Sequence, residues 1–163
     1  ARGFSLSRLR PDALAILGAP LGLAAHGVHL AHLTGDPLAV FHAQAAWGRA
    51  LATPWRTLLD PSAFHPYMGH LERAAAILVL ALGLVLVALR QAPLALFTLA
   101  SLAPILLSGT LMSATRLLVG AFPAFAALAW LGRREPVDRA VVITFTAAQA
   151  FLFFAWSRFY WVA

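Results

Sequence analysis

Cysteine and lysine are both missing from the 163 residues of this chain. Without cysteine the chain can form no disulfide framework, no thiol nucleophile and no cysteine metal site. Charge is scarce as well, because charged residues make up 11% of the sequence whereas a soluble domain carries about 25%. So few polar groups could not cover a water-facing surface of this size. The composition therefore excludes a soluble globular domain.

Apolar residues fill most of the sequence: 61% of it is hydrophobic, and the mean hydropathy is +0.81. The basic residues are all arginine and give the chain a net charge of +6. Most of them stand singly between apolar runs and do not form the clustered basic face of a nucleic-acid-binding module. This pattern is typical of membrane proteins. We expect an all-α integral membrane protein, with membrane lipids as partners and with no nucleic acid, cofactor or metal ion.

Five predominantly apolar stretches are candidates to cross a bilayer, which takes about 20 residues of helix. They predict transmembrane helices at approximately 13–33, 71–89, 93–107, 112–131 and 140–156. Pro11 and Asp12 precede the first stretch, a pattern typical of a helix start. Length and flanking charge define the spans, because helices that are apolar all round carry little periodicity.

The arginines beside the spans predict the orientation of the chain, since cytoplasmic loops carry an excess of basic residues. One side would hold Arg2, Arg8, Arg10, Arg90, Arg133, Arg134 and Arg139, and the other Arg49, Arg56, Arg73, Arg116 and Arg158. The short turn 133–139 is typical of a cytoplasmic loop. We expect the N-terminus of this chain in the cytoplasm, the C-terminus outside, and the bacterial plasma membrane as the location.

This orientation places the long connection 34–70 on the outer side. Within it, residues 38–51 carry apolar side chains at helical spacing and predict a helix in the membrane interface, with Trp47 and Trp55 at headgroup level. A second short element is expected after Pro54 and should end at Asp60, before a proline.

The strongest local signal for function lies between Ser108 and Arg116. The uncharged run after Arg116 has 16 residues, or about 24 Å of helix, so the span should begin before this arginine. A charge at that depth suggests a functional site. With Ser113 or Thr115 as the helix cap, the free N–H groups and the guanidinium would bind an anion such as phosphate. The alternative is an arginine that extends to the lipid headgroups.

Polar and aromatic residues of the outer loop could bind a sugar, which is recognised by planar polar groups beside an aromatic face. The candidates are Asp36, His42, Gln44, Trp47, Arg49 and Trp55. A plain amphipathic interface helix is the alternative, and Asp36 could serve only as a turn and cap residue.

Three histidines recur every third residue near the outer end of the first span, at His26, His29 and His32. They do not share one narrow helix face, which argues against a metal site on that helix. Interfacial histidines are expected, of which one or two could line a polar cavity.

Two motifs occur in order, separated by two predicted spans. The first is GDPLAVFHAQAAWGR at 35–49 with Pro54-Trp55, and the second is SATR at 113–116 followed by FPAF at 122–125. Together with the terminal YWVA, they resemble the C-terminal half of bacterial members of the PIG-V mannosyltransferase family. The resemblance covers nearly the whole chain.

The resemblance implies a polytopic glycosyltransferase of the GT-C type, which transfers mannose or a related hexose to a lipid or glycan acceptor. The sugar donor would be a polyprenyl- or dolichyl-phosphate on the outer face of the membrane, and Arg116 and Ser113 would lie near its phosphate. The essential acidic residue of such enzymes lies in the first outer loop. We therefore expect this chain to be the single C-terminal transmembrane region of a larger protein, with the catalytic base upstream of Ala1.

Two other functions remain open at this point. In a transporter or flippase-like protein, Arg116 and the histidines would line a permeation path, and prolines would break the spans at Pro20, Pro104 and Pro123. In a non-catalytic membrane scaffold, none of these residues would have a chemical role.

Overall fold

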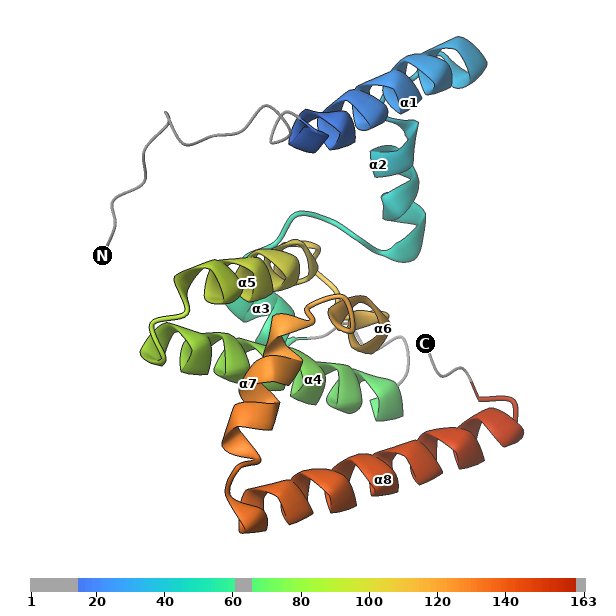
Figure 1. Cartoon of the computed structure of the whole chain (residues 1–163). Coiled ribbons are helices and arrows are strands. Elements are labelled where there is room, and N and C mark those ends of the chain that lie inside the picture. The colour runs from blue at the N-terminus through green and yellow to red at the C-terminus, as the bar shows by residue number, and fades with distance from the viewer. Residues whose placement is uncertain (1–14, 61–65, 161–163) are drawn as a thin grey trace, which may run out of the picture. The chain divides into compact units, whose positions relative to one another are not determined.

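The computed structural model describes residues 15–60 and 66–160 (Figure 1). Every regular element in these two ranges is a helix, which confirms the all-α prediction. By their contacts, the residues fall into two compact units, Ala1–Trp47 and Gly48–Ala163. Three of the described helices are long and apolar enough to cross a membrane, namely Ala15–Thr34, Met68–Ala88 and Glu135–Ser157. This finding supports an integral membrane protein.

The first unit is built on α1, Gly18–Thr34, which covers most of the predicted span 13–33. Residues 13 and 14 of that span, the helix-start residues Pro11 and Asp12, and the N-terminal arginines lie outside the described ranges. The helix ends at Gly35, whose φ is +75° and whose N–H donates to the Ala31 carbonyl over 3.0 Å. Glycine is favoured here because a left-handed residue commonly closes a helix.

The predicted interface helix 38–51 is shorter in the structure. It consists of α2, Ala39–Ala43, followed by the 3-10 helix η3, Gln44–Trp47. The helical path stops at Gly48, where φ is +67°. A left-handed residue at this point turns the chain out of the helix, which the apolar spacing of the segment did not indicate.

The second unit is organised around two packed helices, α4, Pro66–Ala88, and α5, Ala92–Leu107. They lie side by side in Figure 1. Gly83 allows the close approach, since a Cβ there would lie 2.8 Å from Cδ2 of Leu99 on α5. The predicted short element after Pro54 is α3, Pro54–Leu59, which packs on α5.

The predicted span 112–131 is two short helices in the structure: α6, Ala114–Leu118, and α7, Pro123–Leu131. Between them Gly120 and Ala121 donate to carbonyls three residues earlier, as in a turn. Pro123 has no N–H to continue the helical ladder and sits in the first turn of α7, where that absence costs nothing. Gly120 and Pro123 thus interrupt an apolar stretch that its hydropathy predicts as one helix.

The predicted span 93–107 corresponds to α5, which has 16 residues and is about 24 Å long. A hydrocarbon core is about 30 Å thick, so α5 alone is short for a crossing. The described residues thus contain three candidate spans, where the sequence predicts five.

The last helix, α8, runs from Glu135 to Ser157 and begins before the predicted span 140–156. Most of the predicted loop 133–139 is its first turn. Glu135 and Asp138 stabilise this start, because acidic side chains near a helix N-terminus interact favourably with its dipole. The orientation of the chain across the membrane, with its N-terminus in the cytoplasm, stays a prediction.

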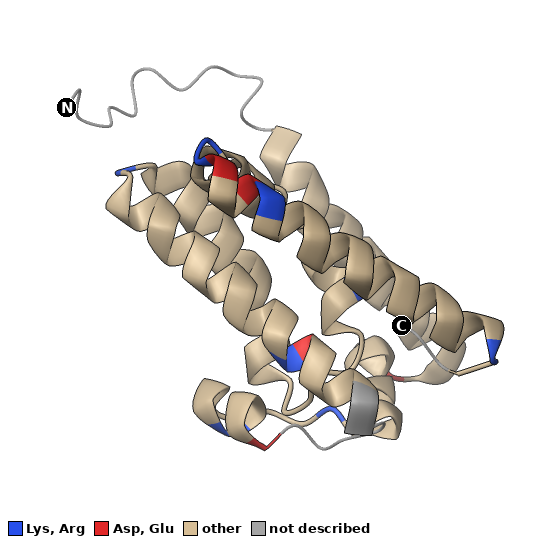
Figure 2. Cartoon of the chain, turned by 90° about the horizontal axis from the view of Figure 1, so that it is seen from below, with Lys and Arg blue, Asp and Glu red and all other residues tan. Residues whose placement is uncertain are grey.

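Charged residues lie mainly at helix ends and in connections, as Figure 2 shows. Many large apolar side chains are exposed between them, including Phe153 at 67% and Ile143 at 68% on α8. An apolar patch of this extent is unfavourable in water and favourable in lipid. The surface of α8 therefore has the character expected for a membrane-facing helix.

Candidate functional site

The predicted phosphate motif forms a turn and the short helix α6. Ser113 precedes α6 with a left-handed φ of +64°, and its side chain accepts no capping hydrogen bond from the first turn of the helix. Ser113 and Ala114 are buried, Thr115 is half-buried and Arg116 is exposed. The turn thus buries its first two residues and leaves the guanidinium accessible.

Glu72 on α4 binds the start of this turn. Its carboxylate Oε1 accepts a hydrogen bond from the Ser113 backbone N–H over 2.5 Å, and the residue is only 7% exposed. A buried carboxylate needs such donors, because an unpaired buried charge is strongly unfavourable. The N–H that the sequence offers to a phosphate is therefore engaged by an acidic side chain of the protein.

Two arginines of the second unit lie on the helices that meet here. Arg73 follows Glu72, donates from Nη2 to the Leu59 carbonyl over 3.4 Å, and leaves its buried Nε without a partner. Arg116 on α6 has no ion pair with any described residue. An exposed guanidinium without a carboxylate partner is available to an anionic ligand.

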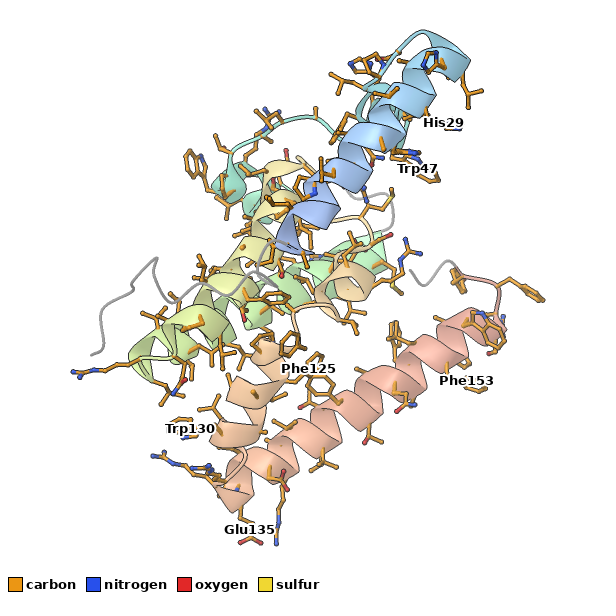
Figure 3. The ribbon with its side chains drawn as sticks, turned by 45° about the horizontal axis from the view of Figure 1, so that its top comes forward. His29, Trp47, Phe125, Trp130, Glu135 and Phe153 are labelled. Atoms are coloured by element: carbon orange, nitrogen blue, oxygen red, sulfur yellow. The ribbon has the colours of Figure 1, made fainter. Side chains whose placement is uncertain are left out.

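A large apolar groove runs between α8 and the helices α4, α6 and α7. Its volume is about 960 Å³, at the upper end of the range of roughly 300–1,000 Å³ for ligand sites. Phe125 on α7 and Phe153 on α8, both labelled in Figure 3, belong to its lining. Its few polar side chains include Thr115 of the predicted motif and Gln149 of α8. The groove thus reaches the residue that precedes Arg116.

In the first unit, Asp36 and His42 form a pair that spacing alone did not predict. The Nδ1 atom of His42 lies 2.6 Å from one carboxylate oxygen of Asp36, and the other oxygen accepts the Leu38 N–H over 2.9 Å. The hydrogen bond to His42 lowers the pKa of the Asp36 carboxyl below its ordinary value. Asp36 is therefore a turn residue in the structure, and its carboxylate holds the imidazole.

The other predicted sugar-binding residues are divided between the two units. Gln44 and Trp47 belong to the first unit, where Gln44 Nε2 donates to the Val40 carbonyl over 3.3 Å and Trp47 is exposed. Arg49 belongs to the second unit and is half-buried. The predicted sugar-binding residues therefore do not all belong to one compact unit.

The three histidines of α1 do not form a metal site in the structure. Histidine, aspartate and glutamate side chains nowhere gather in groups of three or more that could hold an ion, as far as the chain is described. His29, labelled in Figure 3, is exposed on α1.

The residue that sequence reasoning missed is Glu72. Glu72 lies at the start of the predicted span 71–89, but the sequence alone assigned no role to it. A sequence signal existed, because no other acidic residue occurs between Asp60 and Glu135. An isolated acidic residue one turn inside a span is expensive unless it has a function or a partner.

Comparison of the chain with protein-family models, with curated proteins and with solved structures gives no match.

Proposed function

We propose that this chain forms the donor-binding part of a membrane glycosyltransferase. The enzyme would transfer mannose or a related hexose from a polyprenyl- or dolichyl-phosphate carrier to a lipid or glycan acceptor. The observation that carries the proposal is the groove of about 960 Å³, whose lining includes Thr115 beside the exposed Arg116. A ligand that fits both features has a long apolar chain and an anionic head, as a lipid-phosphate sugar does.

The groove and Arg116 would bind different parts of this donor. The isoprenoid chain would lie in the groove, where burial of apolar surface is favourable by about 25 cal/mol per Å². The carrier phosphate would meet Arg116, whose planar guanidinium can donate two parallel hydrogen bonds to it. The resemblance of the GDPLAVFHAQAAWGR and SATR motifs to those of the PIG-V family supports the same donor.

The transfer is an inverting displacement at the sugar carbon. The acceptor hydroxyl loses its proton to a carboxylate base, which the resemblance places in the first outer loop of such enzymes, and its oxygen bonds to the anomeric carbon. The bond from that carbon to the phosphate oxygen breaks, and its electron pair stays on the lipid phosphate. Arg116 would stabilise the negative charge that develops on this leaving group, a role of the oxyanion-hole type.

The proposal includes five membrane segments, two more than the three candidate spans. In it, α5 and the α6–α7 pair, which follow α4 and precede α8 in the sequence, also lie within the membrane and complete the five predicted segments. The segment α2–η3 lies in the outer interface, where Asp36, Gln44 and Trp47 of the first unit would bind sugar or acceptor. Arg49 in the second unit is a separate candidate for such binding. Ser113 and Thr115 lie near the donor phosphate.

Filling the groove should weaken donor use. Ala148→Phe places a ring in the groove, because Ala148 lines it, and should raise the KM for the lipid-linked donor by about tenfold. Ala147→Phe is the matched control, since Ala147 is exposed and is not part of the lining. The assay uses the natural protein in membranes with radiolabelled mannose on polyprenyl phosphate, and follows label that leaves the carrier.

Three results of this assay can be told apart. Transfer by the wild type with a selective defect in Ala148→Phe supports the groove as the donor site. Transfer with equal KM values in the two variants would refute the groove while keeping the enzyme class. If correctly inserted protein transfers sugar from no lipid phosphate, the glycosyltransferase proposal is wrong and the transporter alternative gains.

A further inference from the structure

A single acidic side chain lies inside the second unit, at the place where α4 meets the start of α6. Glu72 is four residues inside the candidate span Met68–Ala88, or about 6 Å along the helix. It is buried, and its hydrogen bond with Ser113 joins residues 41 positions apart in the sequence. Burying a carboxylate there costs free energy. Losing its hydrogen bond to Ser113 should therefore matter more than losing a hydrogen bond at the surface.

The turn to which Glu72 binds is not stable in this conformation by itself. Helix α6 has five residues, too few to be stable alone, and it has no side-chain cap. Ser113 has a left-handed φ of +64°, which is unfavourable for a residue with a Cβ and persists only where the surroundings impose it. The hydrogen bond from Ser113 N–H to Glu72 is a contact across helices that can impose this conformation.

The segment before the turn is held by bonds of a different kind. Ser108 Oγ donates to the Thr110 carbonyl over 2.8 Å, and the Met112 N–H donates to Thr110 Oγ1 over 3.2 Å. These hydrogen bonds join residues two positions apart and fix the conformation within the segment 108–112. They do not reach α4, on which α6 packs through buried apolar side chains such as Ala114 and Leu118. To this packing Glu72 adds a directed hydrogen bond at the start of the turn.

We infer that Glu72 is a positioning residue, which fixes the Ser113–Arg116 turn on α4 and thereby sets where Arg116 meets the donor phosphate. The inference rests on the proposed function for its effect on catalysis, and on the structure alone for its effect on the turn. It also restricts how the phosphate binds. Because the carboxylate engages the Ser113 N–H, that donor does not bind the phosphate, and Arg116 is the group of the turn that meets it.

Substitutions at Glu72 separate positioning from stability. Glu72→Ala removes the acceptor and should lower kcat by about 10²-fold with little change in donor KM, because a misplaced Arg116 no longer meets the transition state. Glu72→Gln keeps an oxygen that can accept from Ser113 and should restore most of the lost turnover. Leu102→Ala is the control for instability, since Leu102 is a buried core residue of α5 and not part of the turn, and the folded fraction of this variant should keep the wild-type kcat.

A double variant tests whether Glu72 acts through Arg116. If it does, adding Glu72→Ala to Arg116→Ala should cause almost no further loss of kcat, since the group to be positioned is already gone. Losses that multiply in the double variant would overturn the inference. So would a Glu72→Ala enzyme that keeps the wild-type kcat.

Hydrogen exchange gives a second readout that needs no activity. Glu72→Ala should accelerate amide exchange at residues 113–116 by at least tenfold, whereas Glu72→Gln and Leu102→Ala should leave this segment close to wild type. Unchanged exchange in Glu72→Ala would refute the anchoring of the turn. Faster exchange in a protein that transfers no sugar would instead uphold the anchoring and refute only the glycosyltransferase proposal.

Discussion

Replacing Arg116 by alanine is expected to slow release of the sugar from its lipid carrier by about 10²–10³-fold. The guanidinium is exposed on α6 and has no ion-pair partner among the described residues, so its loss leaves no internal charge unpaired. The fold should tolerate the change, whereas the leaving phosphate would lose its stabilising charge. Turnover is measured as radiolabel that leaves polyprenyl phosphate, per amount of folded protein.

Two further variants define the chemistry of this effect. Arg116→Lys keeps the positive charge but cannot form the bidentate contact, and should retain an intermediate rate. Arg158→Ala removes another exposed arginine beside a span, at the end of α8, and should leave turnover within the experimental error. A wild-type rate in Arg116→Ala would show that this arginine only extends to lipid headgroups.

Gly109→Ala is expected to destabilise the second unit by about 3 kcal/mol, a large effect for one methyl group. The residue has a φ of +74°, which is costly for alanine, and a Cβ there would lie 2.6 Å from the Ala50 carbonyl oxygen. The clash falls where Ala50 and Ala52 donate their N–H groups to the carbonyls of Ser108 and Leu107. The substitution should therefore also separate the segment 50–52 from the end of α5.

Gly48→Ala separates the two contributions. Gly48 has a similar φ of +67°, but nothing lies within 4 Å of its Cβ position, so only the conformational cost of about 1 kcal/mol remains. Thermal unfolding of both variants in detergent provides the comparison. Equal losses of stability would mean that the contact between residue 109 and Ala50 has no energetic weight.

The helix positions of this chain were largely predictable from its sequence. Long apolar runs flanked by arginine or proline correctly predicted the helices α1, α4, α5 and α8, because a backbone among apolar side chains must form its hydrogen bonds internally. The ends were less predictable. Glu135 belongs to α8, since acidic residues favour a helix start even when they resemble a charged loop.

The break between α6 and α7 shows where a hydropathy pattern is insufficient. Gly120 and Pro123 were visible in the sequence, but prolines also occur inside continuous apolar helices, as Pro104 does in α5. Whether a proline interrupts a helix depends on neighbouring helices that can satisfy the freed backbone groups. That information is tertiary and is not contained in the run itself.

The candidate site was predictable only in part, for a related reason. The Arg116 motif could be found from its position beside a short apolar run, and its exposure agrees with an accessible charge. The partner of Ser113 could not be found, because Glu72 lies 41 residues away and the hydrogen bond depends on how α4 packs against α6. The groove likewise arises between helices that are distant in the chain, so no local pattern specifies it.

The most direct test of a lipid-phosphate donor is photo-crosslinking of the natural protein in membranes with a polyprenyl phosphate that carries a photoreactive group in its chain. We expect saturable labelling of the groove faces of α4 and α8, which unlabelled polyprenyl phosphate displaces more strongly than the uncharged polyprenol. In Arg116→Ala this preference for the phosphorylated lipid should disappear. Labelling that does not saturate, or that spreads over the outward side of α8, would contradict a donor site in the groove.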